Sequence, residues 1–107
     1  MKTFQEYLNE SVMKDDVAGT VMEYSIRKPS RTIPVQHVWL GIIRTPDETQ
    51  KRKGGASRLV DNLKALAKQN NLPIYLDPIG PKAREFFSKR GFMDMPDNPK
   101  IMYYEDV

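Results

Sequence analysis

The feature that most constrains this chain is a basic glycine segment, residues 51–60, which runs directly into an amphipathic pattern. Gly54 and Gly55 follow three cationic residues. Apolar residues then recur with the period of a helix that buries one stripe: Ala56, Leu59, Val60, Leu63, Leu66 and Ala67. A helix start leaves about four N–H groups without partners, and glycine lets an anion approach them closely. The segment therefore predicts a helix preceded by either a phosphate-binding loop or a solvated turn.

The flanking sequence alternates strand and helix patterns. A helix is predicted from Pro81 to Arg90 because Gly91 follows it. Strands are predicted where β-branched and aromatic residues gather between turn residues; they span residues 17–28, 33–43, 73–77, 92–93 and 100–104. The run from Val38 to Ile43 is almost continuously apolar, which is typical of a strand covered on both faces. The order predicts one α/β domain.

Two motifs in this frame resemble those of the GNAT family of N-acetyltransferases. The family's coenzyme A loop reads Arg/Gln-x-x-Gly-x-Gly/Ala, and the corresponding positions here are Lys51, Gly54 and Ala56. The family's next helix reads Ala-x-x-Phe-Tyr-x-x-x-Gly-Phe, which is matched here by Ala83-x-x-Phe86-Phe87-x-x-x-Gly91-Phe92. The resemblance covers residues 18–107. It implies a single compact domain with a mixed, mostly antiparallel twisted sheet that is flanked by helices and splays near the cofactor loop.

The same resemblance implies acetyl-CoA as the cofactor. Its pyrophosphate would bind the backbone and cations of the loop, namely Lys51, Arg52, Lys53, Gly54, Gly55, Ala56, Ser57 and Arg58. Backbone groups near Ile43 and Arg44 would face the pantetheine. Three departures affect this expectation: lysine at position 51 lacks the planar guanidinium fork, Phe87 replaces a tyrosine that often protonates the leaving thiolate, and Gly80 replaces an asparagine. Cofactor binding is therefore better supported by the motifs than catalysis is.

N-acetyl transfer needs a base, because an amine with a pKa of about 10 must lose a proton. Asp77 is the first candidate, since it ends a predicted strand before Pro78, and an Ala-Ser-Arg loop with a later Asp-Pro is similar to the cohesion-establishment acetyltransferases, where that aspartate is implicated in catalysis. Glu23 and His37 are the other candidates. Each has a structural alternative: Asp77 as a loop cap, Glu23 as an exposed strand residue, and His37 as a packing residue beside Trp39.

Composition limits the other classes of function. A chain of 107 residues forms one domain, and none of its apolar runs approaches the length of about 20 residues that a membrane helix needs. With no cysteine and one histidine, disulfides, thiol catalysis and a histidine-rich metal site are excluded, and no metal is expected. The net charge of +3 is concentrated near the glycines, which favours a local anionic ligand over nucleic acid.

Residues 1–10, MKTFQEYLNE, form the second unusual segment. The periodicity allows an N-terminal helix with a small apolar patch. The segment also resembles the capsid-targeting peptide of internal head proteins of T-even-like bacteriophages, which ends at a prohead-protease site of the form Leu/Ile-x-Glu. That resemblance implies a partner, the phage prohead protease cleaving after Glu10. It also implies a mature domain of residues 11–107 that is packaged in the virion and then enters the host cytoplasm; without the peptide, a cytoplasmic protein is expected.

The sequence thus predicts an acetyl-CoA-dependent N-acetyltransferase acting on an unidentified amine, such as that of a host protein. The alternative is an inactive protein of the same fold that binds or inhibits a host factor.

Overall fold

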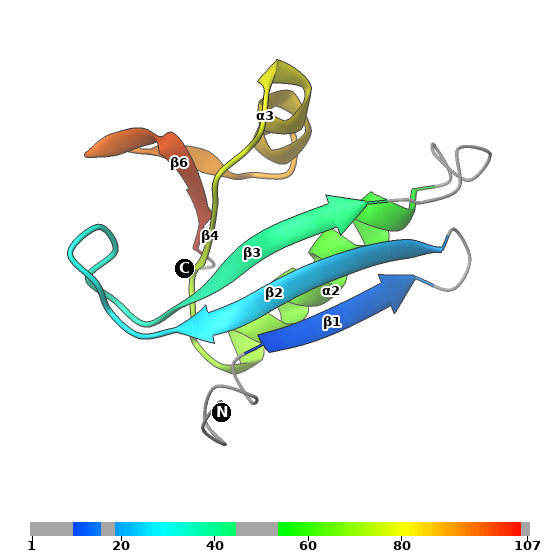
Figure 1. Cartoon of the computed structure of the whole chain (residues 1–107), viewed down its shortest axis with the longest axis horizontal. Coiled ribbons are helices and arrows are strands. Elements are labelled where there is room, and N and C mark those ends of the chain that lie inside the picture. The colour runs from blue at the N-terminus through cyan, green and yellow to red at the C-terminus, as the bar shows by residue number, and fades with distance from the viewer. Residues whose placement is uncertain (1–9, 16–18, 45–53, 106–107) are drawn as a thin grey trace, which may run out of the picture.

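The structure, a computed structural model, describes residues 10–15, 19–44 and 54–105. Figure 1 shows the order of the elements along the chain. They are β1 (Glu10–Asp15), β2 (Thr20–Arg27), β3 (His37–Arg44), α2 (Gly55–Gln69), β4 (Ile74–Leu76), α3 (Pro81–Ser88), β5 (Met93–Met95) and β6 (Asn98–Tyr104). None of the helices in this described part of the chain is long and apolar enough to cross a membrane.

The strands form one six-stranded sheet in the order β1-β2-β3-β4-β6-β5. Its single parallel pair among the described strands is β3 with β4, and the remaining pairs are antiparallel. Parallel neighbours need a crossover, which α2 supplies between them. The predicted fold class, a mixed and mostly antiparallel sheet flanked by helices in one domain, is confirmed.

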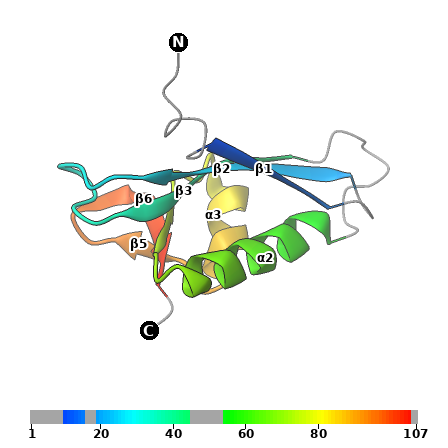
Figure 2. The same ribbon diagram turned by 90° about the horizontal axis from the view of Figure 1, so that it is seen from below.

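The main core lies between α2 and one face of the sheet (Figure 2). Leu59 and Leu63 of α2 are fully buried, as are Met22 of β2 and Ile74 of β4. Burying each of these side chains stabilises the fold by about 1.5–3 kcal/mol before entropy is counted. The predicted apolar stripe of the helix is therefore the stripe that packs on the sheet.

A second, smaller cluster covers part of the opposite face. Successive residues of a strand point to opposite faces, so Trp39 and Tyr75 leave the main core and pack with Tyr103 around Ile33, Met95 and Ile101. The rings of Tyr75 and Tyr103 are stacked with centroids 5.6 Å apart. Burial raises the pKa of Tyr75 above its usual value, with smaller contributions from Glu105 and Tyr103.

Several sequence expectations needed correction. The sequence did not predict β1. Its first residue is Glu10, which ends the segment of residues 1–10 for which a helix was considered. The rest of that segment, residues 1–9, lies outside the described part. The strand predicted from residue 33 begins at His37, because Ile33 belongs to the preceding loop. β3 was expected to be covered on both faces from Val38 to Ile43, but the side chain of Ile42 is 50% exposed. Past Leu40, β3 has no pairing with β4.

Candidate acyl-transfer site

The parallel strands β3 and β4 diverge, and this divergence creates the site. They pair only from Val38 to Leu40 on β3 and from Ile74 to Leu76 on β4. β4 then ends, while β3 continues to Arg44. On the side that faces β4, the backbone of Gly41–Arg44 therefore has no strand partner in the described chain. Every backbone N–H and C=O group needs a hydrogen-bond partner. The groups that β4 leaves unpaired are therefore available to an extended ligand.

A cleft of about 260 Å³ fills the space between the diverging strands. Its walls are Gly41, Ile42 and Ile43 on one side and the Asp77–Ile79 segment on the other. Leu40, Leu76, Ala83 and Phe87 complete the lining. Apart from backbone groups and the Asp77 carboxylate the lining is apolar, so the cleft suits a slender ligand with alkyl and amide groups.

A β-bulge marks the point where the strands separate. Tyr24 pairs with Leu40 and Glu23 pairs with Ile42, so Gly41 has no partner on β2. A bulge kinks the strand and frees backbone groups locally. The bulge also places Gly41 in the lining of a second hollow on the other side of the strand.

The first turn of α2 lies at the same end of the sheet as the end of β3 (Figure 1). Gly54, with φ +81°, precedes the helix in the left-handed conformation that glycine adopts readily, and no side chain caps the helix start. The first N–H groups of α2 thus retain their partial positive charge and can bind an anion. Of the loop residues predicted to bind the cofactor, Gly54 to Arg58 form this turn, whereas Lys51, Arg52 and Lys53 lie outside the described residues.

The structure adds Arg90, which is not among the residues that the sequence motifs predict for the site. Its Nε and Nη2 donate hydrogen bonds to Ser57 Oγ over 3.3 and 3.0 Å. Its Nη1 donates to the carbonyl oxygen of Phe86, and the guanidinium stacks over the Phe86 ring at 3.7 Å. A cation from the end of α3 therefore holds the first turn of α2. A lysine or arginine after a helix is too common for sequence alone to reveal this contact.

The predicted catalytic residues occupy three different places. Asp77 is exposed and lines the cleft directly after β4. Glu23 is exposed on the outer face of β2, beside the bulge, and lines the second hollow. His37 begins β3, four residues before Gly41 and about 13 Å from it along the strand. The structure thus brings Asp77 and Glu23 to opposite sides of Gly41 and leaves His37 away from both hollows.

His37 has the surroundings of a packing residue. It is 2% exposed, its Nδ1 lies 2.8 Å from the carbonyl oxygen of Val35, and its ring meets Tyr75 edge to face. Burial lowers the pKa of His37 below 6.5, an effect that the Val35 contact opposes and Arg27 reinforces. Among the described residues, no group of three or more acidic, histidine or cysteine side chains could hold a metal ion.

Phe87, the position at which the resemblance expects a tyrosine, lies in the cleft lining. The ring is 8% exposed, lines the cleft and packs edge to face against Phe86 and Phe92. It has no proton to donate. Tyr103 packs in the second cluster and Tyr104 stacks near Phe92, so neither lines the cleft.

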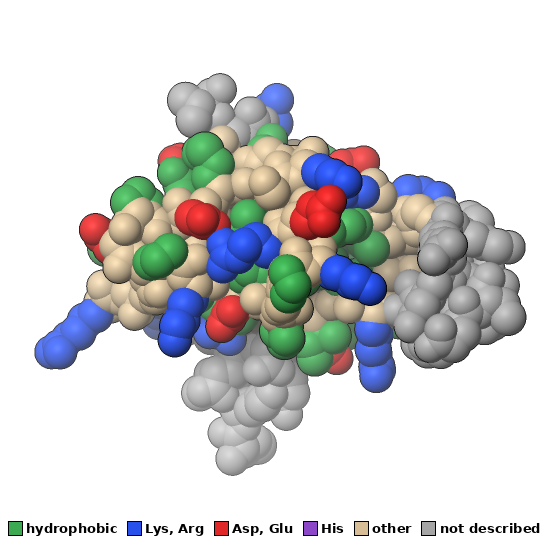
Figure 3. Space-filling model, turned by 90° about the horizontal axis from the view of Figure 1, so that it is seen from above, with side chains coloured by type: hydrophobic (Ala, Val, Ile, Leu, Met, Phe, Trp, Pro, Cys, Tyr) green, Lys and Arg blue, Asp and Glu red, His purple; other side chains and the backbone are tan. Residues whose placement is uncertain are grey.

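The face in Figure 3 shows Lys and Arg side chains interspersed with Asp and Glu.

Comparison with solved structures identifies the fold. The anti-CRISPR protein AcrVA5 matches over 89% of this chain and 99% of its own, with 24% identity and a TM-score of 0.67. A structure titled as histone acetyltransferase HPA2 and related acetyltransferase, from Corynebacterium glutamicum, matches over 97% of this chain and 68% of its own, with 17% identity and a TM-score of 0.68. A chain of the KacTA–DNA complex matches over 80% of this chain and 57% of its own length, with 18% identity and a TM-score of 0.68.

This chain shares the GNAT-like α/β fold of these structural neighbours. Other neighbours of that fold include AtaTR bound with acetyl-CoA, of which this chain spans 57%. No protein-family model and no curated protein matches the sequence.

Proposed function

We propose that this protein is an acetyl-CoA-dependent N-acetyltransferase. The observation that carries the proposal is the cleft between the diverging strands β3 and β4, which has an uncapped helix start at the same end of the sheet. A slender pantetheine arm fits an apolar cleft whose wall offers unpaired backbone, and its pyrophosphate fits N–H groups of a helix start. The fold shared with acetyltransferases supports the same proposal.

Acetyl-CoA would supply an activated acetyl thioester. The residues of this chain then have three tasks. Backbone N–H groups of Gly54–Ser57 bind the pyrophosphate, with Arg90 holding their turn in place through Ser57. The free backbone of Gly41–Arg44 holds the arm and orients the thioester. A carboxylate takes the proton of the attacking amine as the C–N bond forms and the C–S bond breaks.

Asp77 is the preferred base because it lines the cleft itself. Its side chain is exposed, which gives the proton a route to water. Glu23 lies on the other side of Gly41 and is the second candidate. Phe87 has no proton to give, so this position would not protonate the leaving thiolate.

Calorimetric titration with acetyl-CoA tests the binding step directly. We expect binding by the wild-type chain and at least tenfold weaker binding by Ala83→Leu, which narrows the cleft from α3. Lys82→Leu is the matched control, because the neighbouring Lys82 is exposed and does not line the cleft. Absence of binding at high micromolar acetyl-CoA would refute the proposal.

The second candidate function is an inactive protein of this fold that binds or inhibits a host factor. Phe87 favours it, because the cleft lining carries a phenyl ring where a proton donor is expected. The two functions differ in turnover: an inactive binder would retain acetyl-CoA or bind none, and would release no free coenzyme A in the presence of amines.

We further propose that residues 1–10 form a phage capsid-targeting peptide, followed by the acetyltransferase domain of residues 11–107, and that the domain is delivered from the virion to the host cytoplasm. The likeness to an anti-CRISPR protein supports an action on the host. Cleavage after Glu10 would separate it from the remaining residues of β1. N-terminal sequencing of the protein from purified virions tests this; an intact Met1 would contradict it.

A further inference from the structure

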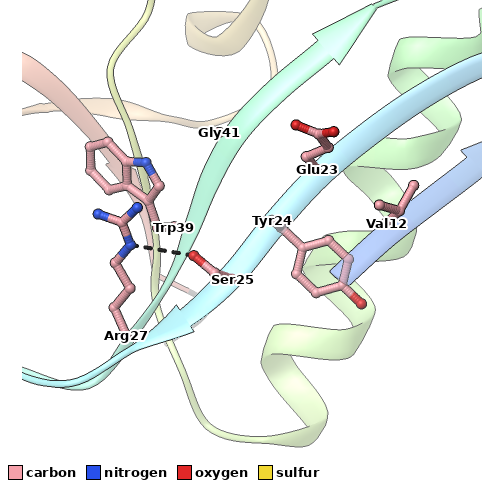
Figure 4. A pocket seen from close by; sticks show the side chains of 7 residues that line it. All are labelled: Val12, Glu23, Tyr24, Ser25, Arg27, Trp39 and Gly41. Atoms are coloured by element: carbon pink, nitrogen blue, oxygen red, sulfur yellow. Dashed lines mark hydrogen bonds between the residues drawn. The ribbon is translucent and has the colours of Figure 1, made fainter. Parts of the chain in front are cut away.

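A second hollow, the sheet-face pocket, lies on the face of the sheet opposite α2. It has a volume of about 450 Å³, and side chains of three neighbouring strands line it (Figure 4). The lining residues are Val12, Glu23, Tyr24, Ser25, Arg27, Trp39 and Gly41. α2 lies on the other face of the sheet (Figure 2).

Gly41 borders both this pocket and the cleft. Its backbone does not need glycine: its φ is not positive, and an added Cβ would meet only the Glu23 carbonyl oxygen, at an ordinary 3.5 Å. The local fold therefore does not require a glycine at this position, which borders both hollows.

The pocket has opposite charges at a defined spacing. Arg27 folds back along β2, where its Nε donates to Ser25 Oγ over 3.3 Å and its guanidinium lies 5.0 Å from the centre of the Trp39 ring. The cation is thus held near Ser25, two residues from Glu23. Two residues along a strand span about 7 Å and share a face. Figure 4 shows Glu23 beside Gly41 and the Arg27 guanidinium beside Trp39.

We propose that the sheet-face pocket binds the acceptor of the reaction, a lysine of an extended peptide segment with an acidic residue two positions away. The lysine amine lies by Glu23 and reaches the thioester past Gly41, while the acidic side chain pairs with Arg27. A carboxylate and an alkyl chain complement the guanidinium and the Trp39 face respectively. This inference rests on the proposed function for the transfer step, but binding in the pocket can be measured without it.

Trp39 is the single tryptophan of the chain and lies in the pocket, so its fluorescence reports occupancy. The probe is a blocked nine-residue peptide of glycine and serine with one Lys-Ser-Asp sequence, and its control carries Lys-Ser-Asn. We expect the aspartate peptide to bind at least tenfold more tightly. Arg27→Glu should remove or reverse this preference, whereas Arg31→Glu, an exposed charge reversal outside the pocket, should retain it.

Equal binding of the two peptides, or an unchanged preference in Arg27→Glu, would overturn the inference. Separate titration with acetyl-CoA distinguishes it from the proposed function. Peptide binding with the expected preference but without acetyl-CoA binding would support the pocket and refute the transferase. Acetyl-CoA binding without discrimination between the peptides would support the transferase and refute the acceptor assignment.

Discussion

Arg90 provides the sharpest test of how the candidate site is held together. Replacing it with alanine removes its hydrogen bonds to Ser57 Oγ and Phe86 O, together with the stacking on the Phe86 ring. Hydrogen bonds of a charged group contribute about 1.5–3 kcal/mol each when buried, and cation–π contacts about 0.5–1 kcal/mol. The contacts are only partly buried, so water replaces part of this energy. We expect Arg90→Ala to lower the free energy of unfolding by about 2–3 kcal/mol.

A double-mutant cycle isolates the contact with Ser57. Ser57→Ala alone should cost about 1 kcal/mol, and the coupling energy with Arg90→Ala should be about 1 kcal/mol. Lys89→Ala is the matched control: the neighbouring Lys89 pairs with Glu85 at 3.0 Å on the exposed side of α3, a contact worth under about 0.5 kcal/mol. Urea denaturation of the four cycle proteins and the control gives these values.

The functional consequence is measured on the same variants. If Arg90 holds the turn that binds pyrophosphate, Arg90→Ala should weaken acetyl-CoA binding more than Lys89→Ala does. A coupling energy below about 0.3 kcal/mol, the usual error of additivity, would show that Arg90 does not hold the turn through Ser57. Equal destabilisation by Arg90→Ala and Lys89→Ala would show the same.

Three further predictions concern the cleft and the buried histidine. Phe87→Tyr should raise kcat about tenfold or more if protonation of the leaving thiolate limits turnover. The substitution should cost under about 1 kcal/mol of stability, because the ring already lines the cleft. An unchanged kcat in steady-state assays would show that this protonation does not limit turnover. Asp77→Asn should lower kcat/KM about 100-fold and leave the affinity for acetyl-CoA within about twofold of the wild-type value. The control Asp97→Asn, an exposed position near the final hairpin, should change neither quantity. Full turnover by Asp77→Asn would exclude Asp77 as the base. Because burial lowers the pKa of His37 below 6.5, the unfolded chain takes up the proton first as the pH falls. The stability that the neutral His37 contributes is therefore complete above pH 6.5. Below pH 6.5 it decreases by up to about 1.4 kcal/mol per pH unit, until the pH reaches the pKa of His37 in the folded chain. Urea denaturation between pH 7.5 and 5.5 should show this loss in the wild type and a flatter profile in His37→Gln; identical profiles would contradict it.

The parts of the fold that sequence predicts well are those fixed by local patterns. The apolar spacing from Ala56 to Ala67 gave the stripe of α2 that packs on the sheet, and Gly54 marked its start. Gly91 placed the end of α3 nearly correctly, and the apolar and aromatic residues 101–104 did the same for the last strand. These features depend on backbone preference and burial period, which neighbouring residues determine.

β1 was missed because its residues carry little strand preference. Its stability comes from pairing with β2 along its whole length, from Glu10 with Ser25 to Asp15 with Thr20. The same limit applies to the site. The motifs indicated the cofactor loop, but Arg90 is more than thirty positions from Ser57 in the sequence. Only the tertiary fold, which places the segment after α3 beside the first turn of α2, brings them together.

The sequence by itself determined the class of fold, the helix that follows the glycines, and the presence of a cationic segment that can bind a phosphate. The helix and the cationic segment follow from short-range spacing, whereas the fold class follows from the order of the elements and from the resemblance of two motifs to the GNAT family. Tertiary structure decided where the chemistry can occur. The early end of β4 opened the cleft, and Gly41 at the bulge came to border both the cleft and the sheet-face pocket. Asp77 lines the first and Glu23 lines the second. Strand divergence and register depend on distant partners, so no local pattern contains them.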